Sequence, residues 1–266
     1  GHCRKFDAGT MCPSWRVTHD EQHLTRGRAN TLRLALSGQL GAQALTSDEL
    51  AQTLSLCVSC KGCRRECPTG VDMSRMKLEY QHQVRQHKAP SLRERLIAHL
   101  PRYAATASRM APLVNALARA PGSGWLREKV LGLSARRSLP VWEREPFTRR
   151  SGDPAPPRAG REVVMLADTF NNHFDAQTLR AAQRVLEAAG WQVHVARPAA
   201  DDPQPDRALC CGRTWLSAGW LDEARAELNR MLAAIAPFVA RGVPRSEEHT
   251  SELQSRQYLV CRLLLE

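Results

Sequence analysis

The sequence predicts an α+β protein of more than one domain, in which an all-α part is followed by a small α/β part. Two observations lead to this prediction. Up to about residue 120, apolar residues recur at helical spacing and no strand pattern interrupts them. From residue 161 onward, strand patterns alternate with helix patterns, which is the βαβ order of a parallel sheet.

The elements of the first part can be placed in chain order. Leucines between Leu24 and Leu40 predict a helix that ends near Gly38 or Gly41. Thr46 or Ser47 is expected to cap a second, short helix that leads into a cysteine-rich loop. A third helix is expected over 73–86, and 91–120 should continue as helix with breaks at Pro101 and Pro112. Residues 1–120 are therefore predicted to be one helical domain.

A linker and an α/β domain are expected to follow. Residues 134–160 hold five prolines and show no sustained period, so 121–160 is predicted to be a proline-rich linker. In the domain 161–244, strands are expected over 161–169 and 191–198, and helices over 175–190 and 221–242. The stretch "LCCGRTWLSAGW" is predicted to form a turn.

The last residues, 245–266, do not continue this pattern. A further strand should follow Gly242, but the chain continues as the polar string "RSEEHTSELQS", which resembles a translated sequencing adapter. We therefore expect that the natural sequence ends near Pro244, that the α/β domain is truncated, and that Cys261 is not a ligand; an ordinary amphipathic tail is the alternative. The start "GHCRKFD", without methionine, suggests a fragment.

Charge and hydropathy limit the possible functions. The 266 residues carry a formal net charge of +11, but the arginines are spread along the chain and aromatic residues make up only 5%. The composition, rich in arginine and alanine and poor in lysine, favours a bias toward GC-rich codons as the explanation of the charge. We therefore predict no nucleic-acid partner, and regard a basic face for an acidic redox partner as the better of the two functional explanations. No apolar run of membrane-spanning length and no signal peptide are visible. We expect a cytoplasmic location, with peripheral attachment at the inner face of the membrane as an alternative.

The cysteines carry the strongest local signal. Four of the nine form the pattern C-x2-C-x2-C-x3-C followed by proline. This is the spacing of bacterial ferredoxins, in which three thiolates bind one [4Fe–4S] cluster and the fourth binds another. Zinc is the alternative, but structural zinc sites usually join two C-x2-C pairs across a longer gap. The spacing therefore predicts a ferredoxin-like, two-cluster helical domain.

The ligands can be assigned by extending this pattern. Cys57, Cys60 and Cys63 would bind one cluster, and Cys12, which is also followed by proline, would complete it. Cys67 would then join Cys3 on a second cluster, which lacks further ligands in this sequence. Three basic residues lie close to these sulfurs in sequence: Lys61, Arg64 and Arg65. Their charge would raise the reduction potential of a bound cluster. The alternative is that they form only a solvated charge run.

Cys210 and Cys211 are adjacent, so their sulfurs normally diverge. A buried structural pair and a metal-ligand role are both left open for them.

A family resemblance joins these observations. "LCVSCKGCRRECPTGVDMSRMK", together with residues 1–38, resembles the C-terminal iron–sulfur region of bacterial FAD-linked oxidoreductases. These are relatives of D-lactate and D-2-hydroxyglutarate dehydrogenases and of the glycolate oxidase iron–sulfur subunit. "LADTFNNHFDAQTLRAAQRVLEAAGWQV" and "LCCGRTWLSAG" resemble the cysteine-rich CCG domain of the same proteins.

The resemblance implies a function. Six cysteines match the family's cluster ligands: Cys3, Cys12, Cys57, Cys60, Cys63 and Cys67. Cys210 and Cys211 match its CCG pair. A family cysteine expected just before Gly1 and the loop expected after Val243 are absent, and "LADTFNN" has no cysteine where related domains often have one. A catalytic metal centre in the CCG half is therefore not expected.

The resemblance also supplies the expected partners. A FAD-binding domain or flavoprotein subunit would deliver electrons from a 2-hydroxy acid, and a quinone or electron carrier would accept them. The alternatives are a separate subunit of a glycolate-oxidase-like or heterodisulfide-reductase-like complex, and a non-enzymatic redox sensor. Because FAD and substrate domains are missing, we expect no catalytic residue and no dehydrogenase turnover from these 266 residues alone.

Overall fold

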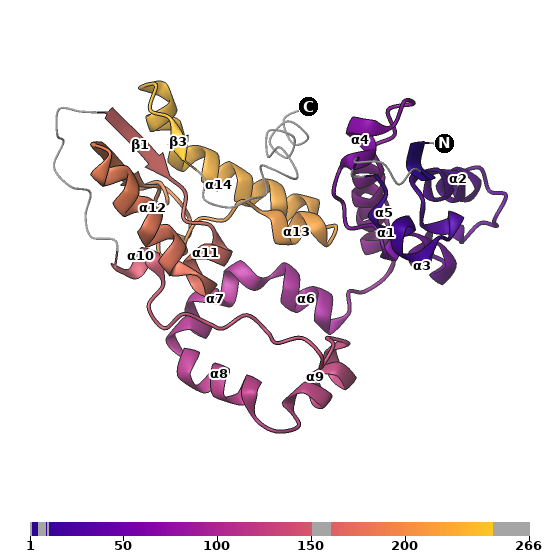
Figure 1. Cartoon of the computed structure of the whole chain (residues 1–266), viewed down its shortest axis with the longest axis horizontal. Coiled ribbons are helices and arrows are strands. Elements are labelled where there is room, and N and C mark those ends of the chain that lie inside the picture. The colour runs from indigo at the N-terminus through magenta and orange to yellow at the C-terminus, as the bar shows by residue number, and fades with distance from the viewer. Residues whose placement is uncertain (1, 5–8, 10, 151–160, 247–266) are drawn as a thin grey trace. The chain divides into compact units, whose positions relative to one another are not determined.

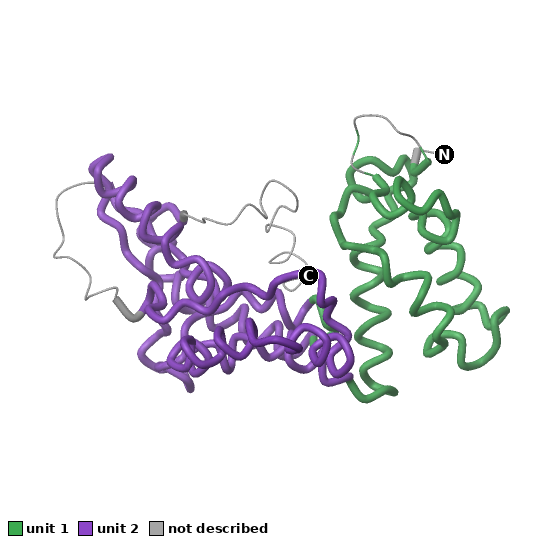
Figure 2. The backbone as a smooth tube through the Cα atoms, turned by 60° about the horizontal axis from the view of Figure 1, so that its bottom comes forward, with its two compact units in different colours: residues 1–90, 217–220, 250–266 green, residues 91–216, 221–249 purple. Residues whose placement is uncertain are grey.

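The computed structural model describes residues 2–4, 9, 11–150 and 161–246. This part of the chain divides into two compact units (Figure 2). Unit 1 comprises the residues up to Pro90 together with 217–220, and unit 2 comprises 91–216 and 221–246. The predicted fold class is confirmed: an all-α, ferredoxin-like region is followed by a small α/β region.

Unit 1 is built from short helices joined by loops (Figure 1). They are η1 (His2–Arg4), α1 (Pro13–Thr18), η2 (Glu21–His23), α2 (Thr25–Leu36), η3 (Ala44–Thr46), α3 (Asp48–Ser55), α4 (Gly62–Glu66) and α5 (Met73–His87). Ser47 caps α3 by accepting the N–H of Leu50, and Asp72 caps α5 by accepting the N–H of Arg75.

The core of unit 1 lies between these helices. Leu24, Leu50, Leu54 and Met73 are almost completely buried there. Cysteines belong to the same core, with Cys3, Cys12 and Cys63 buried and Cys57 and Cys67 packed against them. Since thiols in an apolar core are poorly solvated, they are placed either to pack or to bind a soft metal centre.

Unit 2 begins with four helices: α6 (Leu92–Ala98), α7 (Leu100–Arg109), α8 (Ala111–Arg119) and α9 (Ser123–Leu131). The expected breaks are present, because Pro101 and Pro112 stand at the starts of α7 and α8, where a missing N–H costs little.

The predicted linker 121–160 needs correction, since it contains α9 and also α10 (Phe147–Arg150). Trp142 in this range exchanges hydrogen bonds with Asn115 of α8, and its ring lies tilted against that of Phe174 with 4.4 Å between the ring centroids. The division between the units falls at Pro90 and not near residue 120, because α7 packs on the α/β region. The domain boundaries themselves stay a prediction.

The sheet of unit 2 is parallel, with the strand order β2-β1-β3. β1 (Arg161–Met165) pairs with β2 (Trp191–Val195) in the register Arg161 to Trp191, and the two strands are joined through α11 (Thr169–Phe174) and α12 (Ala176–Ala188). Alternation along β2 directs Val193 and Val195 to the core shared with α12, and His194 to Phe238. Phe238 lies on α14 (Leu221–Ala240), so the two helices cover opposite faces of the sheet.

Three local predictions were wrong or incomplete. The expected turn at 209–220 contains a short helix, α13 (Arg213–Ser217), and α11 begins where the first strand was expected to continue. A third strand does follow Gly242: β3 (Arg245–Ser246) pairs with β1, and the Val164 N–H donates to the Pro244 carbonyl at 2.9 Å. The remainder of the proposed adapter tail lies outside the described residues.

Candidate metal centre

Four thiols surround one pocket in unit 1. The pocket is partly open to solvent, and its lining includes Cys12, Cys57, Cys60 and Cys63. These are the four cysteines that the sequence assigns to one cluster. Cys3 and Cys67 lie in the same unit but do not line this pocket.

The backbone explains how distant residues meet here. Cys12 immediately precedes α1, while Cys57 and Cys60 lie in the loop between α3 and α4, and Cys63 is the second residue of α4. Within that loop Ser59 and Lys61 adopt left-handed conformations, with φ of 54° and 60°. The Met11 N–H donates to Glu66 at 2.9 Å, which ties the segment before α1 to α4.

The thiols influence one another and are poorly solvated. Burial raises the pKa of the Cys60 thiol, against a hydrogen bond from the Gly62 N–H, and negative charge on Cys12 or Cys57 would raise it further. Burial also raises the pKa of Cys63, although the Met73 N–H donates to its Sγ at 3.3 Å. These thiols therefore need a positive partner before they give up their protons at neutral pH.

Cys67 is in a different environment. Partial burial alone would raise its pKa, but hydrogen bonds from the Thr69 hydroxyl and from the backbone N–H groups of residues 69–71 outweigh burial and lower it. Its Sγ lies 3.0 Å from the Thr69 hydroxyl. Cys67 is thus a thiolate-stabilising position apart from the four-thiol pocket.

Positive charge accompanies the pocket. Arg28 lines it, and its Nη1 donates to the Cys12 Sγ at 3.5 Å. Lys77 of α5 donates to the Cys57 carbonyl at 2.6 Å, and burial lowers its pKa. Of the basic residues expected near the sulfurs, Lys61 lines the pocket, whereas Arg64 and Arg65 are exposed.

The donor set fits an iron–sulfur cluster. Within the described ranges, no three His, Cys, Asp or Glu side chains come close enough to hold a single metal ion. A cluster instead places its thiolates at separate corners of a cube, around a space such as this pocket. Soft thiolates beside cationic side chains match the softness and the negative charge of such a group.

Sequence reasoning missed Arg28, although the pattern contains a signal for it. Leu24, Leu32 and Ala35 share the buried face of α2. Arg28 stands at the same helical spacing, so a charged residue occupies an otherwise buried stripe. A charge on such a stripe predicts a buried partner.

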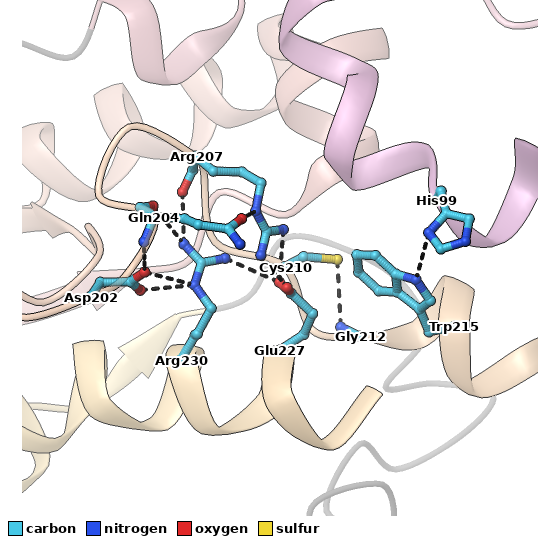
Figure 3. A network of polar contacts seen from close by, with 9 residues as sticks. All are labelled: His99, Asp202, Gln204, Arg207, Cys210, Gly212, Trp215, Glu227 and Arg230. Atoms are coloured by element: carbon cyan, nitrogen blue, oxygen red, sulfur yellow. Dashed lines mark hydrogen bonds and ion pairs between the residues drawn. The ribbon is translucent and has the colours of Figure 1, made fainter. Parts of the chain in front are cut away.

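Cys210 and Cys211 lie in unit 2, and Figure 3 shows Cys210 together with a nearby network of polar contacts. Cys210 is buried, and its Sγ accepts the Gly212 N–H at 3.4 Å. The neighbouring Cys211 and burial together raise the pKa of Cys210 well above its usual value. The described structure brings no third thiol to this pair that could form a single-metal site.

Gly212 is required by the fold of this loop. Its φ is +75°, and a Cβ there would lie 2.7 Å from the Ala224 carbonyl oxygen of α14. Behind the loop, Glu227 accepts from Arg207 and Arg230, and Arg230 also donates to Asp202 at 2.8 Å. Cys210 is thus a buried thiol whose raised pKa favours the protonated form, and its role as a structural residue or a ligand stays open.

His173 is a second buried group that the sequence did not indicate. Its Nδ1 lies 2.8 Å from the Ser108 hydroxyl, and its Nε2 lies 3.3 Å from the Asn172 side-chain nitrogen. Because an amide nitrogen can only donate, Nε2 is the acceptor and Nδ1 carries the proton toward Ser108. Ser108 and His173 are therefore not arranged as a nucleophile and its base.

No helix in the described part of the chain is both long enough and apolar enough to cross a membrane.

Comparison with known proteins places the thiol pocket in a known type of domain. Residues 1–71 match the family model of the 4Fe-4S dicluster domain. No solved structure is significantly similar to this chain.

Full-length relatives show the wider context. The chain is 24% identical over 237 residues to D-2-hydroxyglutarate dehydrogenase of Escherichia coli, covering 72% of this chain and 23% of that protein. The corresponding enzyme of Pseudomonas putida is 24% identical over 241 residues, covering 74% of this chain and 24% of the relative. A probable glycolate oxidase iron-sulfur subunit of Bacillus subtilis is 29% identical over 87 residues, 32% of this chain and 19% of that protein.

This chain spans about a quarter of the length of the dehydrogenases that it matches. It carries a 4Fe-4S dicluster domain and is distantly related to the C-terminal region of D-2-hydroxyglutarate dehydrogenase and to the glycolate oxidase iron–sulfur subunit.

Proposed function

We propose that this chain is the iron–sulfur electron-transfer portion of a FAD-dependent 2-hydroxy-acid dehydrogenase, of the D-lactate, D-2-hydroxyglutarate or glycolate type. The observation that carries the proposal is the pocket lined by Cys12, Cys57, Cys60 and Cys63, inside the segment that matches the dicluster domain. A bound cluster would supply one-electron chemistry, which links a two-electron flavin to other acceptors.

The residues of the chain have separate tasks in this proposal. Cys12, Cys57, Cys60 and Cys63 bind the first [4Fe–4S] cluster, and Cys67 and Cys3 are ligands of a second. The Met73 and Gly62 N–H groups donate to ligand sulfurs, which orients them and offsets negative charge. Leu54 and Met73 pack beside the thiols and limit access of water.

The partners follow from the relatives. Electrons would come from FAD, held by a domain of the same full-length protein or by a flavoprotein subunit. A quinone or another electron carrier would accept them. The chain itself is proposed to carry no catalytic residue, so the 2-hydroxy acid would be oxidised at the flavin.

Anaerobic reconstitution tests the proposal. About four irons and four sulfides per chain are expected for one cluster and about eight of each for two, with an electron paramagnetic resonance signal on reduction. The reduced protein should be reoxidised by a soluble quinone, while D-lactate, D-2-hydroxyglutarate and glycolate should give no turnover without added flavoprotein. Stoichiometric zinc in place of iron and sulfide, or hydroxy-acid turnover by the chain alone, would contradict the proposal.

A separate iron–sulfur subunit is the second candidate function, and the similarity to the Bacillus subtilis subunit favours it. Purification of the native protein distinguishes the two. One polypeptide that contains both flavin and these residues supports a fused dehydrogenase, and two co-purifying polypeptides support a subunit.

A further inference from the structure

Arg28 is a buried cation, and its partners among the described residues include no carboxylate. It is 1% exposed, on the inward face of α2. Its Nε donates to the Thr53 carbonyl at 3.0 Å and its Nη2 to the Ser14 hydroxyl at 2.9 Å. Its Nη1 donates to the Cys12 Sγ at 3.5 Å. None of these described partners is a carboxylate.

Such a charge is costly unless something negative balances it. A buried, unpaired ion costs several kcal/mol even after relaxation of its surroundings. Of the residues that the structure describes, no Asp or Glu lines the pocket beside Arg28, whereas Lys61 does. A negative charge inside the pocket would balance Arg28 and Lys61. The thiols that line the pocket within the described ranges are those of Cys12, Cys57, Cys60 and Cys63.

The hydrogen bond from Arg28 to the Cys12 sulfur would let the charge of Arg28 act directly on a bound cluster. A guanidinium that donates to a ligand sulfur interacts more strongly as that sulfur becomes more negative. Uptake of one electron adds one negative charge to a cluster and its ligands. A fixed cation at a ligand sulfur therefore stabilises the reduced state more than the oxidised state.

We propose that Arg28 is a positioning residue for the Cys12-ligated cluster, and that its buried charge raises the reduction potential of that cluster. This inference rests on the proposed function. A bound cluster would supply one-electron transfer from a reduced flavin, and no bond would be made or broken at Arg28. Arg28 contributes a fixed positive charge and transfers no proton in this step.

Burial distinguishes Arg28 from the basic residues near the sulfurs in sequence. The Arg64 side chain is 45% exposed, so water and salt screen its charge. Arg28 acts from a position of low dielectric, where the same charge has a larger effect. The two further hydrogen bonds to Ser14 and Thr53 hold the guanidinium in place.

The test compares two substitutions with a matched control. Arg28→Gln removes the charge but keeps an amide donor, and Arg28→Lys keeps the charge but loses the fork of donors. Arg33→Gln is the control, because Arg33 is exposed on the same helix and bonds only to the nearby Asn30 in the described structure. Each protein is reconstituted anaerobically, and iron, sulfide and the midpoint potential are measured. The signal that disappears in Cys12→Ser identifies the cluster.

Arg33→Gln should keep the wild-type potential and Arg28→Lys should stay close to it. Arg28→Gln should be harder to reduce by at least about tenfold in the ratio of reduced to oxidised cluster, which is about 59 mV for one electron. If Arg28→Gln takes up little iron while Arg28→Lys takes up the full amount, the charge is needed for assembly, and that also supports the inference.

The contrary outcomes are separable from failure of the proposed function. Full iron in Arg28→Gln with an unchanged potential overturns the role of Arg28 and leaves the proposed function standing. Loss of iron in both Arg28 variants also overturns it, because Arg28→Lys retains the charge. Absence of iron and sulfide from the wild-type protein overturns the proposed function itself, and the inference with it.

Discussion

The two buried thiols Cys12 and Cys210 are surrounded by opposite charge arrangements. Cys12 faces Arg28, whose described partners are neutral groups and the sulfur itself, and lines a pocket with three other thiols. The loop of Cys210 is held by arginines that are each paired with a carboxylate, as Figure 3 shows for Arg207 and Arg230. Among the described residues, the charges near Cys210 are therefore balanced by ion pairs, whereas the charge beside Cys12 is not.

Substitution of the two thiols gives the largest expected difference. Cys12→Ser should remove most of the roughly four irons of the pocket cluster, because serine is a harder, poorer ligand for iron. Cys210→Ser is the matched control and should leave the iron content unchanged. Cys67→Ser should reduce the pocket cluster less than Cys12→Ser does. Iron and sulfide analysis after reconstitution measures all three, and equal loss in Cys12→Ser and Cys210→Ser would contradict the assignment.

Removal of a carboxylate from the network behind Cys210 should cost stability but no iron. Glu227→Ala leaves Arg207 and Arg230 short of a buried anion and should destabilise unit 2 by about 3 kcal/mol. Hydrogen exchange in α14 and in residues 199–212 measures this change locally. The control is Asp222→Ala, at an exposed position in the first turn of the same helix, with an expected cost below about 1 kcal/mol. A loss of iron in Glu227→Ala would show that the two regions are coupled.

The buried histidine of unit 2 should make its stability depend on pH. Burial lowers the pKa of His173 to about 4 from an ordinary value of 6.5. Between these values the unfolded chain binds a proton that the folded chain refuses, so the stability present above about pH 6.5 is lost as pH falls toward 4. From pH 7 to pH 5 the loss should be about 2 kcal/mol.

Hydrogen exchange in α7 and α11 at the two pH values measures this loss. His173→Gln should flatten the pH dependence, and His87→Gln, at an exposed site in unit 1, should not. An unchanged slope in His173→Gln would contradict the prediction.

The sequence predicts the regular elements well where local signals agree. α5 and α12 were expected nearly in full, because Asp72 and Asp175 are side-chain caps and Gly190 takes the left-handed conformation after the helix. α11 and α13 were not foreseen, since each has only a few residues and lies where strand or turn patterns are equally plausible. α9 was hidden by the prolines that follow it.

The candidate site shows a similar limit. The spacing of Cys57, Cys60 and Cys63 predicts a metal centre, because one short segment of the chain supplies all three thiols. The meeting of Cys12 with them depends on how α2 and α3 pack, and local pattern alone only suggests it through the proline that follows. Arg28 was missed because its partners, Ser14 and Thr53, lie on other elements. Ser14 and Thr53 approach Arg28 only through tertiary packing, which the spacing of residues along the sequence does not reveal.

The smallest expected effect concerns the exposed basic residues of α4. Arg65 lies beside the cysteine loop in sequence but is exposed, so solvent and salt screen its charge. Arg65→Gln should change the ratio of reduced to oxidised cluster by about twofold at most in low salt, and by nothing measurable in 1 M salt, where the screening length is about 3 Å. The shift in Arg28→Gln should persist in high salt, because a buried charge is screened much less. Redox titrations of both variants at the two salt concentrations measure this contrast. An Arg65→Gln shift that equals that of Arg28→Gln, or that survives high salt, would mean that charge acts on the cluster through the surface and that burial of Arg28 gives it no special role.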